Sequence, residues 1–223
     1  MDLFVKMPLF AGLDPEALKG LSEQVTQHTA TRGEAIFEEG EQGDRIYLIL
    51  DGKVKISRTS QDGRENLLAV LGPGDLFGEL SVFDPGPRTA TASALADTSF
   101  ASLSHAQLKP WLGTRPEAAE ILLAALARRL RRTNDAMSDL VFTDVPGRVA
   151  KALLSLAERF GVQVGDTVQV EHGLTQEELA QLVGASRETV NKALADFANR
   201  GWLHIEQRQV TIIDSERLAR RAR

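Results

Sequence analysis

The chain has 223 residues, 43% of them hydrophobic and 26% charged, which is typical of a soluble globular protein rather than a disordered one. The net charge of −5 gives no overall indication of a nucleic-acid partner. Because cysteine is absent, disulfides, thiolate nucleophiles and cysteine-ligated zinc or iron–sulfur sites are excluded. No apolar run reaches the roughly 18 residues of a membrane span, and the opening segment lacks a cationic signal region, so we expect a cytoplasmic protein without a membrane partner.

Short strand-like runs, separated by turn residues, occupy residues 24–103. The runs are Glu34–Phe37, Arg45–Leu50, Lys53–Ser57, Asn66–Leu71, Arg88–Ala94 and Thr98–Leu103. Asp51-Gly52, between two of these runs, predicts a tight β-hairpin turn. About seven short strands at this spacing predict a jelly roll or a small β-barrel.

From Pro116 the hydrophobic period becomes helical, and glycine is absent until Gly147. Positions of an a/d seam recur at alternating spacings of three and four: Leu123, Leu126, Leu130, Thr133, Met137 and Leu140. Such a seam usually meets another helix of its kind, which favours a homodimer, although the helix could instead pack on its own barrel. Asp144 as an N-cap, followed by Pro146, predicts a hinge and the start of a new helix.

The C-terminal part carries the pattern of a helix-turn-helix. Thr175-Gln176-Glu177-Glu178 is a capping box that begins a short helix. Gly184 interrupts this helix, and Ser186 is placed to cap the next one. The runs Trp202–Glu206 and Gln209–Ile213 predict a small hairpin, or wing, after the second helix.

The second of these helices presents groups that can read DNA bases. Helical spacing places Arg187, Glu188, Asn191 and Lys192 on one exposed face. A guanidinium can hold guanine O6 and N7 together, and a carboxylate can accept a hydrogen bond from cytosine N4. Charged helix faces are usually only solvated, so this pattern alone leaves DNA reading open. The negative net charge lies entirely within residues 1–115, and residues 144–223 are neutral overall.

The run Phe77–Ala92 combines groups that suit an anionic ligand. Gly78 permits a close approach to the backbone, Glu79 supplies a carboxylate, and Arg88 supplies a planar guanidinium that fits phosphate oxygens. The alternative is that Glu79 and Arg88 form an ion pair that closes a surface loop.

These motifs resemble, in order, those of the cyclic AMP receptor protein and FNR superfamily, most closely its actinobacterial cyclic AMP receptor proteins. The matching segments are FGEL with PRTA, ARRLRRTND, FTDVPGRVA and VGASRETVNKAL. The resemblance implies an α+β fold with a jelly-roll β-barrel sensor over residues 1–115, a dimerisation helix and hinge over 116–143, and a winged helix-turn-helix over 144–223. It further implies a transcription regulator that responds to cyclic AMP and binds double-stranded DNA as a homodimer at palindromic operators, with RNA polymerase as a partner.

The resemblance also implies roles for single residues. Glu79 would accept the ribose 2′-hydroxyl of the allosteric effector, 3′,5′-cyclic AMP, and Arg88 would neutralise its phosphate. Other nucleotide contacts would come from Gly78, Leu80, Thr89, Thr133 and Asn134, the last replacing a serine of the family's best-known member. Arg187 and Glu188 would read bases. Position 192 is lysine, where the family's best-known member has arginine, and lysine is a point donor rather than a planar fork. Caps or phosphate contacts are expected from Thr175, Ser186, Thr189 and Arg200.

Three alternative functions fit the sequence less well. A haem or iron–sulfur effector lacks cysteine ligands, and the four histidines are scattered without metal-ligand spacing. A nucleotide-binding module that acts only through protein partners leaves the helix-turn-helix unexplained. An enzyme is not expected, because no catalytic triad, P-loop or paired-carboxylate motif occurs.

Overall fold

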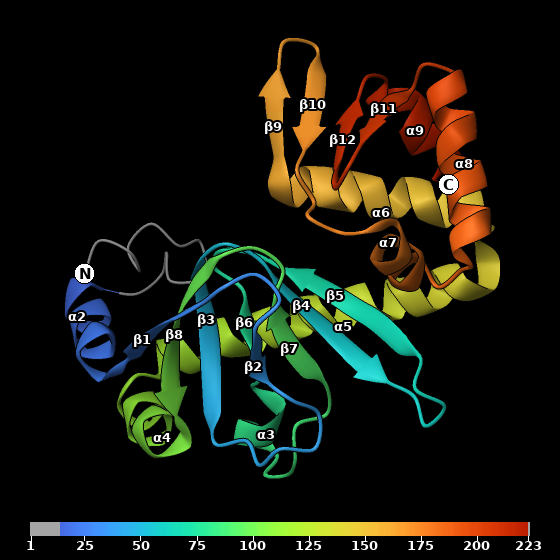
Figure 1. The fold of residues 1–223 in the computed structure, drawn as a ribbon. Coiled ribbons are helices and arrows are strands. Elements are labelled where there is room, and N and C mark those ends of the chain that lie inside the picture. Colours follow the sequence, from blue (N-terminus) through green and yellow to red (C-terminus); the bar gives the residue numbers. More distant parts are fainter. Residues whose placement is uncertain (1–13, 223) are drawn as a thin grey trace. The chain divides into compact units, whose positions relative to one another are not determined.

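The structure is a computed structural model that describes residues 14–222 (Figure 1). The chain separates into two compact units. One holds the chain up to Arg58 together with Ala69–Arg132, and the other holds Thr59–Leu68 and the residues from Thr133 onward. The units therefore divide within the long helix. In the described part of the chain, no helix is both long and apolar enough to cross a membrane.

Eight strands between Thr26 and Ser104 form two four-stranded sheets. The strands are β1 (Thr26–Ala30), β2 (Ala35–Phe37), β3 (Arg45–Asp51), β4 (Val54–Thr59), β5 (Glu65–Leu71), β6 (Leu76–Phe77), β7 (Thr91–Ala94) and β8 (Thr98–Ser104). The sheet orders are β1-β8-β3-β6 and β2-β7-β4-β5, so strands that follow one another in the chain mostly lie in opposite sheets. This is the double-sheet arrangement of a jelly roll, and the predicted α+β fold is confirmed.

The predicted hairpin at Asp51-Gly52 is wrong, because β3 and β4 lie in different sheets. Gly52 does have the expected positive φ, of 89°. The glycine is needed for a second reason, since a Cβ there would lie 2.4 Å from the carbonyl oxygen of Asp97. The predicted strand Arg88–Ala94 is also too long, because β7 begins at Thr91 and leaves Arg88 in a loop. Strand β1 was not predicted because its residues are mainly polar, and β6 was not predicted because it is only two residues long.

Aromatic and aliphatic side chains fill the jelly roll between its sheets. Phe77 is fully buried and stacks on Tyr47 with ring centroids 5.0 Å apart. A second cluster lies where helices cover the β1-β8-β3-β6 sheet, and it includes Leu48 and Trp111. The covering helices are α2 (Pro15–Gln24), α4 (His105–Thr114) and the start of α5 (Pro116–Phe142), while the short α3 (Leu80–Phe83) follows β6.

Helix α5 buries only its first turns against the jelly roll. Ala118 and Leu122 belong to the core cluster beneath the helix. The predicted seam is largely exposed in the single chain, with Leu123, Leu130 and Met137 each between 62% and 66% accessible. These three seam residues therefore do not pack on the protein's own barrel.

The second unit contains the predicted helix-turn-helix and wing. Its helices are α6 (Val145–Phe160), α7 (Gln176–Val183), α8 (Arg187–Asn199) and α9 (Ser215–Arg221). Its sheet has the order β11-β12-β10-β9, formed by β9 (Gly161–Val164), β10 (Thr167–Val170), β11 (Leu203–Glu206) and β12 (Gln209–Ile212). Val149, Val190, Phe197 and Leu218 are buried at its centre.

Candidate functional site

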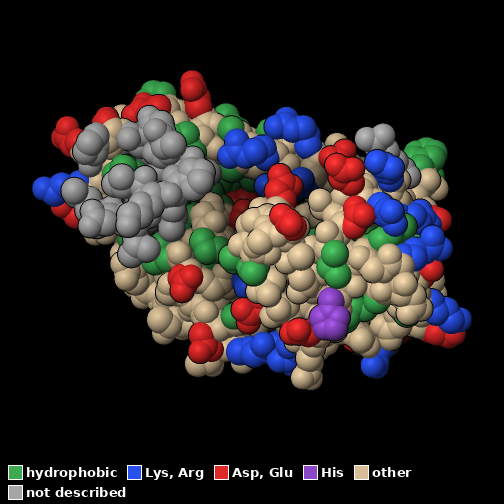
Figure 2. All heavy atoms as spheres, turned by 90° about the horizontal axis from the view of Figure 1, so that it is seen from above, with side chains coloured by type: hydrophobic (Ala, Val, Ile, Leu, Met, Phe, Trp, Pro, Cys, Tyr) green, Lys and Arg blue, Asp and Glu red, His purple; other side chains and the backbone are tan. Residues whose placement is uncertain are grey.

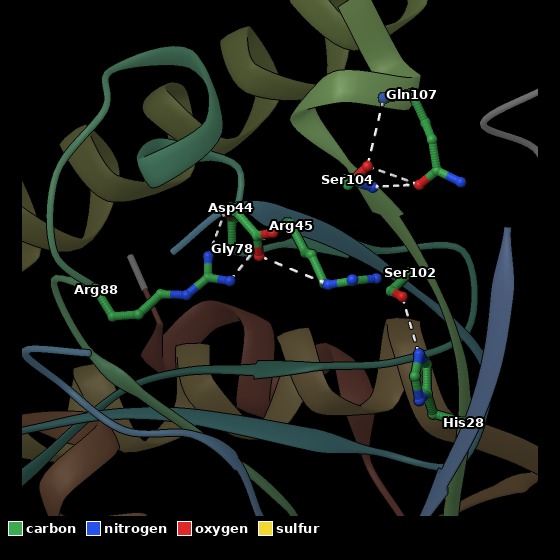
Figure 3. Close-up of polar contacts among 8 residues, drawn as sticks. All are labelled: His28, Asp44, Arg45, Gly78, Arg88, Ser102, Ser104 and Gln107. Atoms are coloured by element: carbon green, nitrogen blue, oxygen red, sulfur yellow. Dashed lines mark hydrogen bonds and ion pairs between the residues drawn. The ribbon is translucent and has the colours of Figure 1, made fainter. Parts of the chain in front are cut away.

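Arg88 is a buried cation in the loop before β7. The residue is only 4% exposed, and its Nη1 and Nη2 donate to the carbonyl oxygens of Gly78 at 2.8 Å and Arg45 at 3.0 Å (Figure 3). The guanidinium also lies over the Phe37 ring, 4.2 Å from its centroid. No carboxylate of the described residues pairs with Arg88, and its Nε is buried without a hydrogen-bond partner. A buried, uncompensated guanidinium with unused donors is suited to an anion.

Two glycines give the guanidinium its space. Gly78 has a φ of 74°, and a Cβ on it would lie 2.8 Å from Nη1 of Arg88. A Cβ on Gly43 would lie 2.6 Å from Cβ of Ser81 and 2.7 Å from Cζ of Arg88. Gly78 was predicted as a site residue, whereas Gly43 was missed, because it is distant in the chain from the recognised motif.

Glu79 is the second buried charge of this site. Its side chain is 5% exposed, and Oε1 accepts a hydrogen bond from Nη1 of Arg129 at 2.8 Å. Oε2 is buried and has no hydrogen-bond partner. The alternative of a Glu79–Arg88 ion pair is therefore wrong, since Glu79 pairs with Arg129 and Arg88 donates to two backbone carbonyl oxygens. Arg129 was not predicted as a site residue, because it lies 50 residues away from Glu79, on α5.

The other predicted nucleotide contacts lie at the edge of this site or on α5. Leu80 opens α3 and is 51% exposed, and Thr89 is exposed next to Arg88. Thr133 and Asn134 are exposed on α5. Thr133 follows Arg129 by four residues, so both occupy the same face of the helix.

The start of each helix in the helix-turn-helix has the predicted cap. Oγ1 of Thr175 accepts from the backbone N–H of Glu178 at 3.1 Å, and the Glu178 carboxylate accepts from the N–H of Thr175 at 2.8 Å. Oγ of Ser186 accepts from the N–H of Thr189 at 3.2 Å. Gly184 ends α7 with a φ of 70°, which produces the sharp turn into α8.

The predicted base-reading face of α8 is exposed, apart from Asn191. Arg187 is exposed, and Nζ of Lys192 pairs with Oε1 of Glu188 at 2.7 Å, with both side chains about three-quarters exposed. Asn191 is instead partly buried, and its Oδ1 is buried without a hydrogen-bond partner. An exposed pair such as Glu188–Lys192 contributes little to stability, so both groups can exchange partners readily.

Arg200 ends α8 rather than lying on its reading face. Its Nε donates to Oδ2 of Asp196 at 2.8 Å, and its guanidinium lies over the Trp202 ring. On the face drawn in Figure 2, Lys and Arg side chains are interspersed with Asp and Glu.

An arginine joins the end of α5 to the helix-turn-helix. Arg148, in the first turn of α6, donates from Nη1 to the carbonyl oxygen of Thr143 at 2.8 Å. It also donates from Nε to Val183 and from Nη2 to Gly184, at 3.0 and 3.1 Å. These two carbonyls belong to the turn between α7 and α8. Arg148 thus links the residue that follows α5 to the turn that precedes α8.

Comparisons with known proteins agree with this arrangement. Residues 27–114 match the Cyclic nucleotide-binding domain, and residues 147–221 match the Crp-like helix-turn-helix domain. The chain is 57% identical over 222 residues to the CRP-like cAMP-activated global transcriptional regulator of Mycobacterium tuberculosis, covering 100% of this chain and 99% of that protein. It is 39% identical over 194 residues to the Cyclic AMP receptor protein of Thermus thermophilus, covering 87% of each. The solved structure of FixK2 from Bradyrhizobium japonicum is similar with a TM-score of 0.78 at 27% identity, covering 88% of this chain and 96% of that one.

Proposed function

Because this chain belongs to the CRP/FNR family of transcription regulators, we propose that its jelly roll binds 3′,5′-cyclic AMP and that the bound nucleotide controls DNA binding by its helix-turn-helix. The identity of 57% to a regulator named as cAMP-activated supports this effector. We further propose residues 1–115 as the sensor, 116–143 as the dimerisation helix and hinge, and 144–223 as the DNA-binding part. The site of action would be the cytoplasm, where DNA and RNA polymerase are both present.

The pair of buried, incompletely partnered charges supports nucleotide binding most strongly. Arg88 holds a positive charge whose remaining N–H groups can donate to the two free oxygens of a cyclic phosphate. Oε2 of Glu79 can accept from the ribose 2′-hydroxyl, which would satisfy a buried acceptor. A ligand that carries an anion and a hydroxyl close together meets both requirements. Contacts from Gly78, Leu80, Thr89, Thr133 and Asn134 to the phosphate and base complete the proposal.

The exposed seam of α5 supports a homodimer. Leu123, Leu130, Met137 and Leu140 are each more than half exposed, although they repeat at the spacing of a coiled coil. A long apolar stripe of this kind is stabilised when a second copy covers it. Thr133 lies within the same stripe, so an adenine contact there would place the nucleotide beside the dimer interface.

The dimer would place two copies of α8 against DNA. Two-fold symmetry requires a palindromic operator, with half-sites about 34–36 Å apart or a multiple of that distance. Arg187 and Glu188 are the proposed base readers, together with Lys192. The backbone contacts would come from Thr175, Ser186, Thr189 and Arg200, and Asn191 contributes less because it is partly buried.

The proposed control passes along α5. Arg129 connects this helix to Glu79, and Asp139, ten residues further along, forms an ion pair with Lys151 of α6. A nucleotide that changes the position of Arg129 would therefore act on α5, the helix that leads along the chain to the Arg148 contacts. The shift in DNA affinity can be no larger than the nucleotide's preference for one arrangement over the other.

Calorimetric titration with cyclic AMP and cyclic GMP tests the nucleotide site. We expect the wild type to bind cyclic AMP and Arg88→Ala to lose most of the binding, since the phosphate would lie unpaired in the site. Arg88→Lys keeps the charge without the bidentate geometry and should bind with intermediate affinity. Circular dichroism confirms that each variant is folded. Unchanged affinity in folded Arg88→Ala would contradict the proposal.

A mobility-shift experiment on a pool of palindromic DNA tests the second half of the proposal. Enrichment of particular sequences is expected if α8 reads bases. A nucleotide-binding module that acts only through protein partners would give no enrichment, and that result would refute the DNA-binding function.

A further inference from the structure

The C-terminal helix α9 carries an arginine on an anchored face. The helix has only 7 residues, which is too short for a helix to be stable in isolation. Packing supplies its stability, because Leu218 is fully buried and Ala222, which follows the helix, is 8% exposed. Arg221 lies three residues after Leu218, so both are on neighbouring positions of the helix surface. The burial of α9 therefore fixes the place from which the Arg221 side chain extends.

Arg221 pairs with the residue that caps α6. Its Nη2 donates to Oδ2 of Asp144 at 2.6 Å, while Oδ1 of Asp144 accepts from the backbone N–H of Gly147 at 3.0 Å. A Cβ on Gly147 would lie 3.3 Å from the carbonyl oxygen of Arg221, so the end of α9 lies against the first turn of α6. The hydrogen bond from Arg221 is the main cause of the lowered pKa of Asp144. The carboxylate is thus ionised and paired at neutral pH.

Asp144 also belongs to the junction between α5 and α6. This junction consists of Thr143 and Asp144, since α5 ends at Phe142 and α6 begins at Val145. Asp144 has an extended backbone, with a φ of −68° and a ψ of 164°. A rotation of α6 against the end of α5 must change the dihedral angles of the junction, because the helices on either side keep theirs. A contact that holds Asp144 in one conformation therefore resists this rotation.

The other contacts at the junction come from α5 and α6 themselves. Asp139 of α5 pairs with Lys151 of α6 and accepts from Oγ1 of Thr143. Arg148 of α6 donates to the carbonyl oxygen of Thr143. Arg221 adds a third element to these contacts, and this element is packed on the helix-turn-helix side of the junction. The C-terminal helix is thus placed to brace the junction from outside it.

We propose that Arg221 is a positioning residue for the proposed nucleotide control: by holding Asp144, it keeps the α5–α6 junction in a defined arrangement, which lets a change in α5 alter DNA affinity. The inference rests on the proposed function and extends it to the C-terminal helix. Without the pair, the junction samples several arrangements whether or not the nucleotide is bound. The difference in DNA affinity between the two ligation states then becomes smaller.

Two variants at adjacent positions of α9 test the proposal. Arg221→Met removes the guanidinium and keeps an aliphatic side chain. Arg220→Met is the matched control, because Nη2 of Arg220 lies 3.5 Å from Oε2 of Glu216 within the same helix, and both side chains are exposed. For each protein, operator affinity is measured with and without saturating cyclic AMP. The ratio of the two affinities is the nucleotide response.

We expect Arg221→Met to reduce the nucleotide response by about two- to fivefold, the range that one exposed ion pair can supply. Arg220→Met should respond as the wild type does, and Arg221→Lys should retain most of the response because it keeps the charge. Calorimetry establishes that cyclic AMP still saturates each variant. A purely structural role for Arg221 would lower the thermal unfolding temperature and leave the nucleotide response unchanged.

The variant Asp144→Ser tests the pair itself. Serine caps a helix about as well as aspartate does, but it carries no charge for Arg221 to pair with. We expect Asp144→Ser to reduce the nucleotide response as Arg221→Met does. The double variant should reduce it no further than either single variant, because both remove the same interaction.

Three results would overturn the proposal. These are an unchanged nucleotide response in Arg221→Met, an equal reduction in Arg220→Met, and additive reductions in the double variant. A wild-type protein whose operator affinity does not respond to cyclic AMP would instead refute the underlying function, so the two failures are distinguishable.

Discussion

The substitution Glu79→Gln tests the hydroxyl-binding role of the buried carboxylate. Glutamine keeps the shape of the side chain but replaces one carboxylate oxygen with a donor group. In the structure, Oε1 is engaged by Arg129 and Oε2 is the unpartnered acceptor. The glutamine oxygen is expected to stay with Arg129, so its amide nitrogen would face the ribose and could not accept from the 2′-hydroxyl.

The expected loss of cyclic AMP affinity follows from the charge of the hydrogen-bond acceptor. A hydrogen bond to a charged group contributes about 1.5–3 kcal/mol. Because about 1.4 kcal/mol corresponds to a tenfold change, Glu79→Gln should weaken cyclic AMP binding by about 10- to 150-fold. The apo protein should stay folded, since the Arg129 hydrogen bond is retained without its charge.

Isothermal calorimetry with cyclic AMP and 2′-deoxy cyclic AMP gives a complete double-mutant cycle. If Glu79 binds the 2′-hydroxyl, the wild type should lose affinity for the deoxy nucleotide, and Glu79→Gln should bind both nucleotides about equally. Additive losses, in which the variant still discriminates as strongly as the wild type, would refute the assignment of Oε2 to the ribose.

Three other substitutions test the interface, the hinge and the reading helix. Met137→Glu should place like charges across the seam and give monomers in sedimentation velocity at concentrations where Ser138→Glu, next to the seam, stays dimeric. Asp144→Ala should lower the free energy of unfolding by about 1 kcal/mol through loss of the N-cap. The pKa of Asp144 is lowered mainly by the hydrogen bond from Arg221 and next by the hydrogen bond from the N–H of Gly147. The stabilisation that the ionised Asp144 carboxylate provides is therefore present at neutral pH and is lost as the pH falls through that lowered value. Arg187→Ala should relax preference at one guanine of the operator by about 1–3 kcal/mol in binding competition.

Each of these three predictions would be contradicted by a specific result. A dimeric Met137→Glu protein would remove the seam from the interface. A stability difference between wild type and Asp144→Ala that does not shrink in acid would show that the carboxylate charge is unimportant. An equal loss on all DNA sequences for Arg187→Ala would assign that arginine to the phosphates.

The sequence was most informative where the deciding contacts are local. The caps at Asp144, Thr175 and Ser186 are completed by backbone groups three residues further on, so a short motif contains all the partners. Gly184 was predicted in the same way, because a left-handed turn strongly favours glycine. The jelly roll followed from many short runs together, although single strand limits were inaccurate.

The sequence was least informative where the partners are distant. Asp51-Gly52 has the composition of a hairpin turn, but β3 and β4 join different sheets. The turn is contacted by Asp97 and Thr98, which are more than 40 residues further along the chain. The partner of Glu79 could not be chosen by spacing, because the nearer Arg88 was a plausible cation and Arg129 lies on another element. The sequence thus identified Glu79 and Arg88 as candidate charges, whereas it did not identify their hydrogen-bond partners.

The most direct test of the proposed regulation is the affinity of the wild-type protein for its selected operator with and without saturating cyclic AMP, at one salt concentration. A coupling between sites is typically about 1–3 kcal/mol, so we expect the nucleotide to change DNA affinity by about 5- to 150-fold, and this response to disappear in Arg88→Ala. Equal operator affinity with and without the nucleotide, in a protein that binds cyclic AMP, would contradict the claim that the jelly roll controls the helix-turn-helix.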